Sequence, residues 1–242
     1  MENVNKEGIS GGAFPSDPLR HHLGIFAKEP IPGQVKTRLS PPLTPAEAAR
    51  LYEVCLQETV QRLRETDVAL TLFYTGSEAY FRRIFPDIVL QPQEGNDLGE
   101  RLVRALSFLF NQGATGAALV GSDSPDIPLP LVKEAFELLG EAKALTIPAR
   151  DGGYVLVGEG SHHPRLFRDI PWSTDQVLSE TRCRVAELNL DYRELAPWDD
   201  VDDLPSLGRL LERSPACETA CFVRAHLTKY LSLIEGLKSQ RG

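Results

Sequence analysis

Short apolar runs alternate with amphipathic helical patterns along most of the sequence. The runs LGIFA from Leu23, VALTLFYT from Val68 and GAALVGSD from Gly116 are typical of buried strands, and the third predicts a central strand buried on both faces. The segments between such runs have apolar residues at three- and four-residue spacing, which is typical of helices. Strands joined by helices form right-handed crossovers and a mostly parallel sheet. The sequence therefore predicts an α/β fold, a three-layer α/β/α sandwich with a mainly parallel sheet.

Three of the predicted helices have clear start signals. A capping box pairs a helix-start residue that carries a side-chain oxygen with Glu or Gln three residues later, and proline is favoured at the first helical position. Helices are also predicted from about Leu204 and from about Glu218, the second being a long C-terminal helix around Cys217 to Leu237. The start signals are Thr44, Pro45 and Glu47 for the first helix, Asp97 and Glu100 for the second, and Ser173 and Gln176 for the third.

The composition bounds the domain organisation and the classes of partner. The chain has 242 residues, 42% of them hydrophobic, and a formal net charge of -8 at a sequence pI of about 5.2. We expect a single domain over 23–242, preceded by a flexible leader at 1–22 that lacks the apolar core of a signal peptide. An acidic chain argues against a broad nucleic-acid or anionic-membrane footprint. Because it has no run of ~18 apolar residues, we expect a cytoplasmic protein.

The cysteines and histidines show no metal-binding pattern. The cysteines form no CxxC pair, so we expect buried thiols rather than a zinc site or disulfides. The histidines of two adjacent pairs lie in polar segments without ligand spacing, and we expect them to be solvated. These residues are Cys55, Cys183, Cys217 and Cys221, and His21, His22, His162 and His163.

Charged residues follow three of the predicted strands. The carboxyl ends of parallel strands meet at one edge of the sheet, which is where ligands bind in this architecture. A polyphosphate needs cations, and its divalent metal needs hard oxygen ligands such as carboxylates. Together the loops indicate a phosphate and metal site, although each loop alone is equally consistent with a solvated connection. The residues are Lys28, Lys36 and Arg38 in the first loop, Asp123 and Asp126 in the second, and Arg150 and Asp151 in the third.

A second acidic cluster lies in WDDVDDLPSLGRL, at Asp199, Asp200, Asp202 and Asp203. Acidic residues at a helix N-terminus are favoured by capping and by the helix dipole. The cluster therefore has two explanations, a helix cap and a set of metal ligands, and both remain open. The residues themselves indicate a phosphate and metal site in an α/β domain and nothing more specific.

Six motifs in a fixed order carry a resemblance to a known family. The sequence contains FAKEPIPGQVKTRLSPPLTPAEAARLY, EGNDLGERL, GSDSPDIP, DGGYVLVG, PWSTDQVL and DVDDLPSL. With these motifs, from about Leu23 to Leu207, the chain resembles a bacterial family of nucleotide-diphospho-sugar-transferase-like proteins. That family is labelled rSAM/selenodomain-associated transferase 1 and, in some settings, arsenosugar-biosynthesis glycosyltransferase. It is similar in turn to the molybdenum-cofactor and 2-phospholactate guanylyltransferases, so the resemblance implies the GT-A (nucleotide-diphospho-sugar transferase) fold.

The resemblance implies roles for individual residues. Asp123 and Asp202 would hold Mg²⁺ or Mn²⁺, and Asp151 would act as a base or lie beside the metal. The implied catalytic residues are Asp123, Lys36 and Asp151. The implied nucleotide- and phosphate-binding residues are Ala27, Lys28, Gly33, Lys36, Arg38, Gly95, Asp97 and Gly99. The implied acceptor-side residues are Gly152, Gly153, Tyr154, Trp172, Ser173 and Thr174.

Three of these motifs leave an alternative open. A loop and a capping box explain EGNDLGERL as well as a ligand pocket does. Trp172 would either stack on a sugar or base, or pack in the interior. Where relatives read like DVDTPxDL, this chain has Asp203 and Leu204, which leaves the helix cap open and keeps Asp202.

The implied activity is glycosyl transfer from a nucleotide sugar to an unknown small acceptor. Nucleotidyl transfer from an NTP to a phosphorylated acceptor, with release of pyrophosphate, is the alternative, because the VKTRL loop resembles nucleotidyltransferases. A noncatalytic nucleotide-binding protein is a further alternative. The expected partners are a nucleotide or nucleotide sugar and the acceptor, with no nucleic acid and no membrane. The C-terminal helix is expected to pack on the domain or to form a homodimer.

Overall fold

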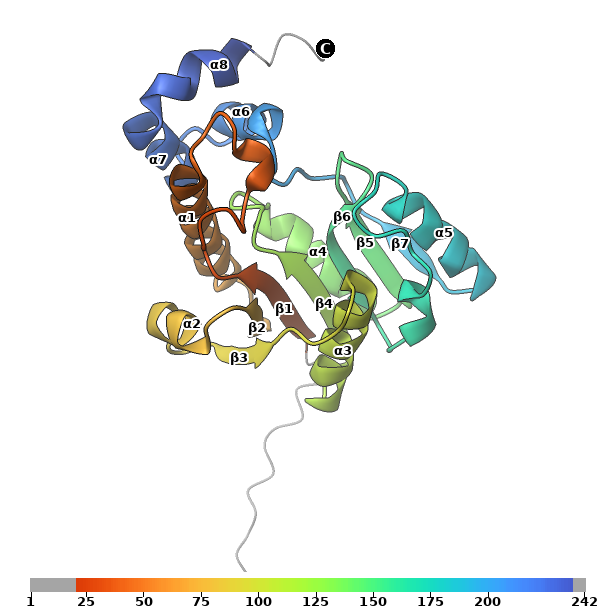
Figure 1. Cartoon of the computed structure of the whole chain (residues 1–242). Coiled ribbons are helices and arrows are strands. Elements are labelled where there is room, and N and C mark those ends of the chain that lie inside the picture. Colours follow the sequence, from red (N-terminus) through yellow and green to blue (C-terminus); the bar gives the residue numbers. More distant parts are fainter. Residues whose placement is uncertain (1–20, 237–242) are drawn as a thin grey trace, which may run out of the picture.

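A single sheet lies between two layers of helices in the computed structural model, which describes residues 21–236 (Figure 1). The strands are β1 (His21–Lys28), β2 (Ala69–Thr75), β3 (Val89–Pro92), β4 (Gly116–Gly121), β5 (Ala144–Pro148), β6 (Tyr154–Glu159) and β7 (Tyr192–Glu194). The helices are α1 (Pro45–Leu63), α2 (Glu78–Ile84), α3 (Leu98–Asn111), α4 (Leu129–Leu139), α5 (Val177–Glu187), α6 (Leu204–Arg213), α7 (Glu218–His226) and α8 (Leu231–Gly236). Short 3₁₀ helices are η1 (Thr37–Leu39), η2 (Pro164–Phe167) and η3 (Thr228–Tyr230).

The strand order explains where the carboxyl ends of the strands meet. The order is β3-β2-β1-β4-β6-β5-β7, and β4 is the central strand, as predicted. All neighbouring strands are parallel except that β6 runs antiparallel to both β4 and β5. Only a short turn joins β5 to β6, and such a turn cannot support a parallel crossover. The three-layer α/β/α fold with a mainly parallel sheet is confirmed.

Two apolar cores fill the space on either side of the sheet. Alternate residues of a strand point to opposite faces, so Leu23 and Ile25 of β1 pack with α1, α2 and α4. Phe26, which lies between Ile25 and Ala27, points the other way and contacts the other core, beneath α3 and α5. β1 and β4 pair in parallel, so their carboxyl ends lie side by side.

A third core lies beyond the sheet, between α1 and the C-terminal helices. It contains Leu39 and Leu43 of the loop after β1 and the inner faces of α6 and α7. Figure 1 shows α6, α7 and α8 gathered beside that loop. The prediction of one long C-terminal helix is wrong. The chain leaves helical geometry at Leu227, which is buried in this core, and α8 then brings Ile234 into the same core.

Two of the three predicted helix starts are confirmed. The Thr44 hydroxyl accepts a hydrogen bond from the backbone N–H of Glu47 in a full capping box, and Asp97 caps α3. The third helix, α5, begins at Val177 rather than at Ser173. Ser173 has a positive φ of 65° and the Thr174 hydroxyl donates to the Pro171 carbonyl, so this segment forms a turn before the helix.

The N-terminal boundary and the histidines also differ from expectation. Residues 1–20 of the expected leader lie outside the described residues, and its last two residues already belong to β1. The His21 ring stacks on Phe136 at 5.0 Å between ring centroids. His162 Nδ1 lies 2.8 Å from the buried Glu159 carboxylate. His21 and His162 are therefore packed side chains rather than solvated ones.

The cysteines are also less buried than expected. Cys55 is completely buried in the third core, whereas Cys183 and Cys221 are exposed and Cys217 is half-buried. Cys183 and Cys221 lie on outward-facing positions of α5 and α7, because those helices bury only one stripe of residues. All of them are free thiols.

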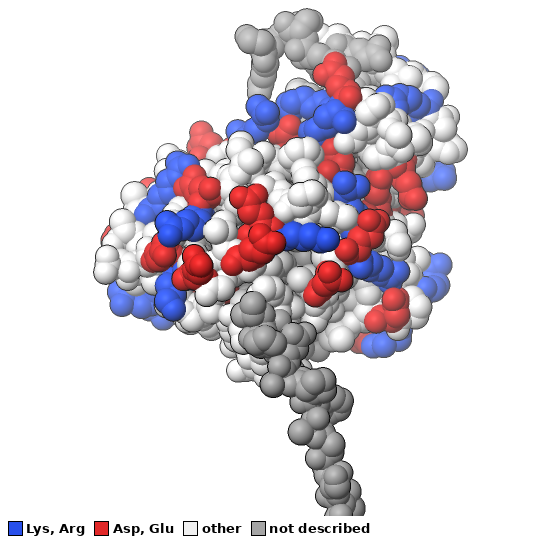
Figure 2. All heavy atoms as spheres, turned by 180° about the vertical axis from the view of Figure 1, so that it is seen from behind, with Lys and Arg blue, Asp and Glu red and all other residues white. Residues whose placement is uncertain are grey.

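The distribution of surface charge and the apolarity of the helices are relevant to the kinds of partner that the protein can bind. On the face opposite to that of Figure 1, basic and acidic side chains are interspersed (Figure 2). Among residues 21–236, no helix is both long enough and apolar enough to cross a membrane.

A buried ion-pair network attaches the C-terminal helices to the end of the sheet. Arg213 of α6 binds the carboxylate of Asp126, in the loop after β4, through Nε at 2.6 Å and Nη2 at 2.9 Å. The same guanidinium reaches Asp199 Oδ2 at 2.9 Å. The Asp126 and Asp199 side chains are only 2% and 8% exposed. Both carboxylates therefore depend on arginine for most of the solvation that they lose on folding.

Arg213→Met is expected to lower the free energy of unfolding by roughly 3 kcal/mol, because it leaves two buried carboxylates without their shared cation. Urea unfolding followed by circular dichroism measures this loss. The matched control is Arg193→Met, because Arg193 and its partner Asp191 are about half exposed and such surface pairs contribute about 0–1 kcal/mol. Equal effects of the two substitutions would contradict the structural role of the network.

Candidate active site

A cleft of about 620 Å³ opens at the carboxyl ends of β1 and β4. The loops after these two strands and the start of α3 form its walls. Its lining includes six of the predicted cations and carboxylates as well as residues that the sequence did not indicate. The polar lining residues include Lys28, Lys36, Arg38, Tyr52, Gln93, Asn96, Asp97, Arg101, Ser122, Asp123, Ser173 and Asp202.

The ends of β1 and β4 are joined through Tyr52 of α1. The Tyr52 hydroxyl accepts a hydrogen bond from the backbone N–H of Lys28 at 2.9 Å and lies 2.8 Å from the Ser122 hydroxyl. Tyr52 and Ser122 are almost completely buried. Tyr52 of α1 therefore helps to hold together the two loops that carry the predicted cations and carboxylates.

Lys36 is held between two carboxylates from different loops. Its ammonium contacts Asp123 Oδ1 in the loop after β4 and lies 3.0 Å from Asp202 Oδ1 in the segment before α6. The Lys36 side chain is only 3% exposed. Burial by itself lowers the pKa of Lys36, but the Asp123 and Asp202 charges outweigh it and raise the pKa above its ordinary value. Lys36 therefore keeps its charge over the whole physiological range.

The backbone at Lys36 has an uncommon conformation. Its φ of 48° and ψ of 40° lie in the left-handed region, which a residue with a long side chain rarely occupies. Lys36 directly precedes η1, and its backbone carbonyl accepts a hydrogen bond from the backbone N–H of Leu39 at 3.0 Å. The loop after β1 thus fixes the direction in which this lysine points.

The segment that carries Asp202 is attached to the loop after β4. The backbone N–H of Val201 donates to the Asp123 carbonyl at 2.9 Å. Asp203 caps α6 and accepts from the Ser206 N–H at 2.8 Å. The two explanations of the acidic cluster therefore apply to different residues: Asp203 is a helix cap, and Asp202 faces the cleft.

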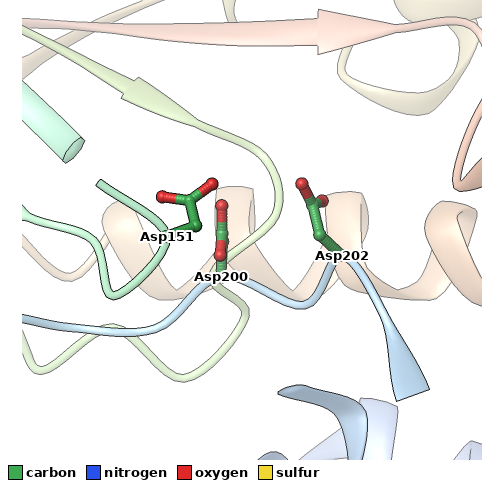
Figure 3. Close-up of side chains that lie close together, drawn as sticks. All are labelled: Asp151, Asp200 and Asp202. Carbon is green, nitrogen blue, oxygen red and sulfur yellow. The ribbon is translucent and has the colours of Figure 1, made fainter. Parts of the chain in front are cut away.

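Asp202 belongs to a group of three carboxylates. Oxygen atoms of Asp151, Asp200 and Asp202 all lie within 4.8 Å of one another. Figure 3 shows Asp151 on the loop after β5, and Asp200 and Asp202 on the segment before α6, with their carboxylates close together. Asp151 Oδ1 also accepts a hydrogen bond from the Gly153 N–H at 3.0 Å. Three hard oxygen donors in this arrangement are a donor set suited to Mg²⁺ or Mn²⁺.

The carboxylates differ in how their charges are balanced. Burial, followed by the charges of Asp202, Asp151 and Asp123, raises the pKa of Asp200 to about 7. Burial also acts to raise the pKa of Asp202, but Lys36, Arg38 and Lys28 lower it below its ordinary value. The local field is therefore most unfavourable for a negative charge at Asp200.

The predicted nucleotide-binding residues are divided between the cleft and its supports. Ala27, Lys28, Lys36, Arg38 and Asp97 line the cleft. The glycines Gly33, Gly95 and Gly99 are not among the lining residues that the structure describes. Gly33 and Gly95 have positive φ values of 82° and 139°, so they allow turns that residues with a side chain rarely adopt.

Most of the predicted acceptor-side residues are not among the described residues that line the cleft. Tyr154 and Ser173 line it, whereas Gly152, Gly153, Trp172 and Thr174 are not among its described lining residues. The Trp172 ring lies edge-on to Tyr154, with 6.5 Å between ring centroids. A Cβ atom on Gly99 would come within 2.6 Å of Trp172 Nε1. Trp172 is therefore packed against Tyr154 and α3, and its stacking on a sugar or base stays a prediction.

Gln93 was not indicated by the sequence, although it has a defined orientation in the cleft. Its Nε2 donates to the carbonyls of Ala27 at 3.2 Å and Phe73 at 2.9 Å. Carbonyl oxygens only accept, so the amide can have only this orientation, and Oε1 is the atom left for a ligand. Tyr52 was also missed, because it follows the same three- and four-residue spacing as the core residues of α1.

Asp200 was assigned no role by the sequence, although the acidic cluster was recognised. A run of acidic residues does not show which of its members are paired with cations. The available signal was the direct neighbourhood of Asp200 and Asp202 in the chain, which limits how far apart their carboxylates can lie.

The sequence and the fold are similar to those of other bacterial proteins. Residues 55–174 match a family described as "uncharacterized protein conserved in bacteria (DUF2064)". No curated protein matches the sequence. A crystal structure from Desulfovibrio desulfuricans G20, described as a candidate nucleotide-diphospho-sugar transferase, is similar with a TM-score of 0.82 and 31% identity. The similarity covers 90% of this chain and 98% of that one.

More distant structures share the fold alone. A cytidylyltransferase from Leptospira borgpetersenii serovar Hardjo-bovis has a TM-score of 0.54 at 14% identity, over 89% of this chain and 97% of that one. A CMP:2-keto-3-deoxy-manno-octonic acid synthetase in complex with CTP has a TM-score of 0.54 at 11% identity, over 85% and 99%. The resemblance in the ordered motifs, the family match and the 31% identity over nearly the whole relative agree. The chain belongs to the bacterial DUF2064 family, and its fold is that of the nucleotide-diphospho-sugar transferases.

Proposed function

We propose that this protein is a metal-dependent transferase that uses a nucleotide sugar and transfers its glycosyl group to a small acceptor. The observation that carries the proposal is the meeting of Asp151, Asp200 and Asp202, because Asp202 lines a cleft that is also lined by basic residues. A nucleotide sugar presents two phosphates, which need cations and a divalent metal. The 31% identical relative, a candidate nucleotide-diphospho-sugar transferase, supports the same class.

The carboxylate group fits a divalent ion by its chemistry. Mg²⁺ and Mn²⁺ prefer oxygen ligands and retain several waters, so two or three carboxylates are sufficient. When bound, such an ion would stabilise the negative charge that develops on the departing nucleoside diphosphate. The sharing of one ion by Asp123 and Asp202 stays a prediction, as does the role of Asp151 as a base.

The remaining residues of the cleft would bind and orient the substrate. Lys28, Arg38 and Arg101 carry positive charge into the cleft, and arginine can contact two phosphate oxygens through its planar group. Tyr154 and Ser173 line the part of the cleft that is formed by β6 and the turn before α5. We assign these two residues to the acceptor side.

Nucleotidyl transfer is the second candidate function. The cations that follow β1 directly, Lys28, Lys36 and Arg38, favour it, because a triphosphate carries more negative charge than a sugar diphosphate. The CTP complex of the structurally similar synthetase is consistent with this candidate. A noncatalytic nucleotide-binding protein is the third candidate, and turnover separates it from the other two.

The released product distinguishes these functions. The protein is incubated with Mg²⁺ or Mn²⁺ and panels of nucleotide sugars and NTPs, together with extracts of small-molecule acceptors. We expect release of a nucleoside diphosphate, measured by ion-exchange chromatography. Release of pyrophosphate would contradict glycosyl transfer and indicate nucleotidyl transfer. Metal-dependent binding of a nucleotide without either product would indicate a noncatalytic nucleotide-binding protein.

Asp200→Asn is expected to lower the turnover by at least about 100-fold, because the ion then loses one charged ligand worth several kcal/mol of charge stabilisation. The matched control is Asp191→Asn, which removes the charge of an exposed aspartate that pairs with Arg193 on the surface. Turnover that is unaffected by Asp200→Asn, or lowered equally by both substitutions, would contradict a role for the carboxylate group.

The same substitution is expected to stabilise the metal-free fold. The folded-state pKa of Asp200 lies near 7, above the ordinary value, so its ionised form destabilises the fold at pH 8. Asp200→Asn removes this charge, and we expect a gain of roughly 1–2 kcal/mol, or about 3–6 °C in Tm. The gain should shrink as the pH falls below about 7, because wild-type Asp200 then takes up a proton in the folded state. Differential scanning calorimetry of the wild type and the variant in EDTA, at pH 8.0 and 5.5, tests both statements. A Tm of Asp200→Asn below that of the wild type at pH 8.0 would contradict them.

A further inference from the structure

The ammonium of Lys36 takes the position of a second cation in this site. We propose that Lys36 permanently bridges Asp123 and Asp202, so that the site takes a single divalent ion, held by Asp151, Asp200 and Asp202. This inference rests on the metal dependence in the proposed function. It gives Lys36 the role of a positioning residue, in place of the phosphate-binding role that the sequence implied. It also departs from the prediction that Asp123 shares the ion with Asp202.

The contacts of Lys36 are those of an enclosed cation. Its ammonium contacts one carboxylate from the loop after β4 and one from the segment before α6, which are far apart in the chain. Only 3% of the side chain is exposed, so a phosphate has little access to it. The left-handed backbone at Lys36, an uncommon conformation for a lysine, directs the side chain into this place.

Asp202 has the position of a bridging carboxylate. In two-metal sites, two cations about 3.5–4 Å apart are held by shared ligands. Asp202 Oδ1 binds the Lys36 ammonium, while the same carboxylate belongs to the group with Asp151 and Asp200. A carboxylate has about four lone-pair positions, so it can contact two cations at once. The arrangement thus resembles a two-cation site in which one of the cations is an ammonium.

The local charges favour one divalent ion. The carboxylates of Asp151, Asp200 and Asp202 lie within 4.8 Å of one another, and Lys36 joins Asp202 to a fourth carboxylate, that of Asp123. Lys36 neutralises one of these negative charges, and Arg38, 3.8 Å from Asp202, neutralises a second. The remaining negative charge equals that of one divalent ion. Lys28, which is exposed, is then the cation of this loop that remains for a nucleotide.

The stoichiometry of Mn²⁺ binding without nucleotide tests the inference. Equilibrium dialysis and the electron paramagnetic resonance signal of free Mn²⁺ are expected to give one ion per chain for the wild type. Lys36→Met leaves Asp123 and Asp202 without their cation, and we expect it to bind two ions per chain. The double variant Lys36→Met/Asp123→Asn removes the pair together and is expected to bind one. Lys229→Met, which breaks an ion pair with Glu47 outside the cleft, is the matched control and is expected to bind one.

Two results would overturn the inference. One is a single ion in folded Lys36→Met with the wild-type affinity, because the ammonium would then not occupy a cation position. The other is loss of the wild-type ion in Asp123→Asn. We expect that variant to keep its ion with at most about a tenfold weaker affinity, since Asp123 would contribute only a screened charge. If Lys36→Met does not fold, the comparison of Asp123→Asn with the wild type decides.

The failure of the proposed function would look different. If the wild type binds one Mn²⁺ and Lys36→Met binds two, but no nucleoside diphosphate or pyrophosphate is released, the transferase function fails and the assignment of Lys36 stands. If the wild type binds no Mn²⁺ at all, both the metal dependence and the assignment of Lys36 are overturned.

Discussion

The guanidinium of Arg213 fixes the acidic segment of the site to the rest of the molecule. It pairs with Asp126 beside β4 and with Asp199, which directly precedes Asp200 in the chain. The hydrogen bond from the Val201 N–H to the Asp123 carbonyl continues this attachment. A buried ion pair is weak as a source of stability, because desolvation offsets most of the attraction. Its effect here is positional: it keeps Asp200 and Asp202 at the end of the central strand.

This attachment has an electrostatic consequence for the site. It brings carboxylates from three segments of the chain together beside the cleft, where burial strengthens their repulsion. Lys36 and Arg38 balance only part of that negative charge. By contrast, Asp97 and Asp203 lie at helix starts, where backbone N–H groups satisfy them. The concentration of incompletely balanced charge is therefore particular to the cleft, as expected for a cation-binding site.

Sequence patterns predicted the parts of the structure that depend on residues close together in the chain. The alternation of strands and helices, the central position of β4 and the caps at Thr44 and Asp97 all follow from neighbouring residues. The antiparallel direction of β6 was not visible, because it depends on the short turn from β5 and on the place of β6 between two other strands. The pairing of Lys36 with Asp202 was also hidden, because it joins distant segments whose relative position only the complete fold determines.

The acidic cluster before α6 shows most clearly why a motif does not determine a site. Asp199 is enclosed by arginines, Asp203 caps the helix, Asp202 binds Lys36, and Asp200 has a raised pKa. These four environments occur within five consecutive residues, since an extended segment turns successive side chains to opposite sides. The sequence shows that acids are present, but their chemistry depends on which cations the fold brings to each of them. For that reason Lys36, on a loop far away in the chain, decides what Asp202 can bind.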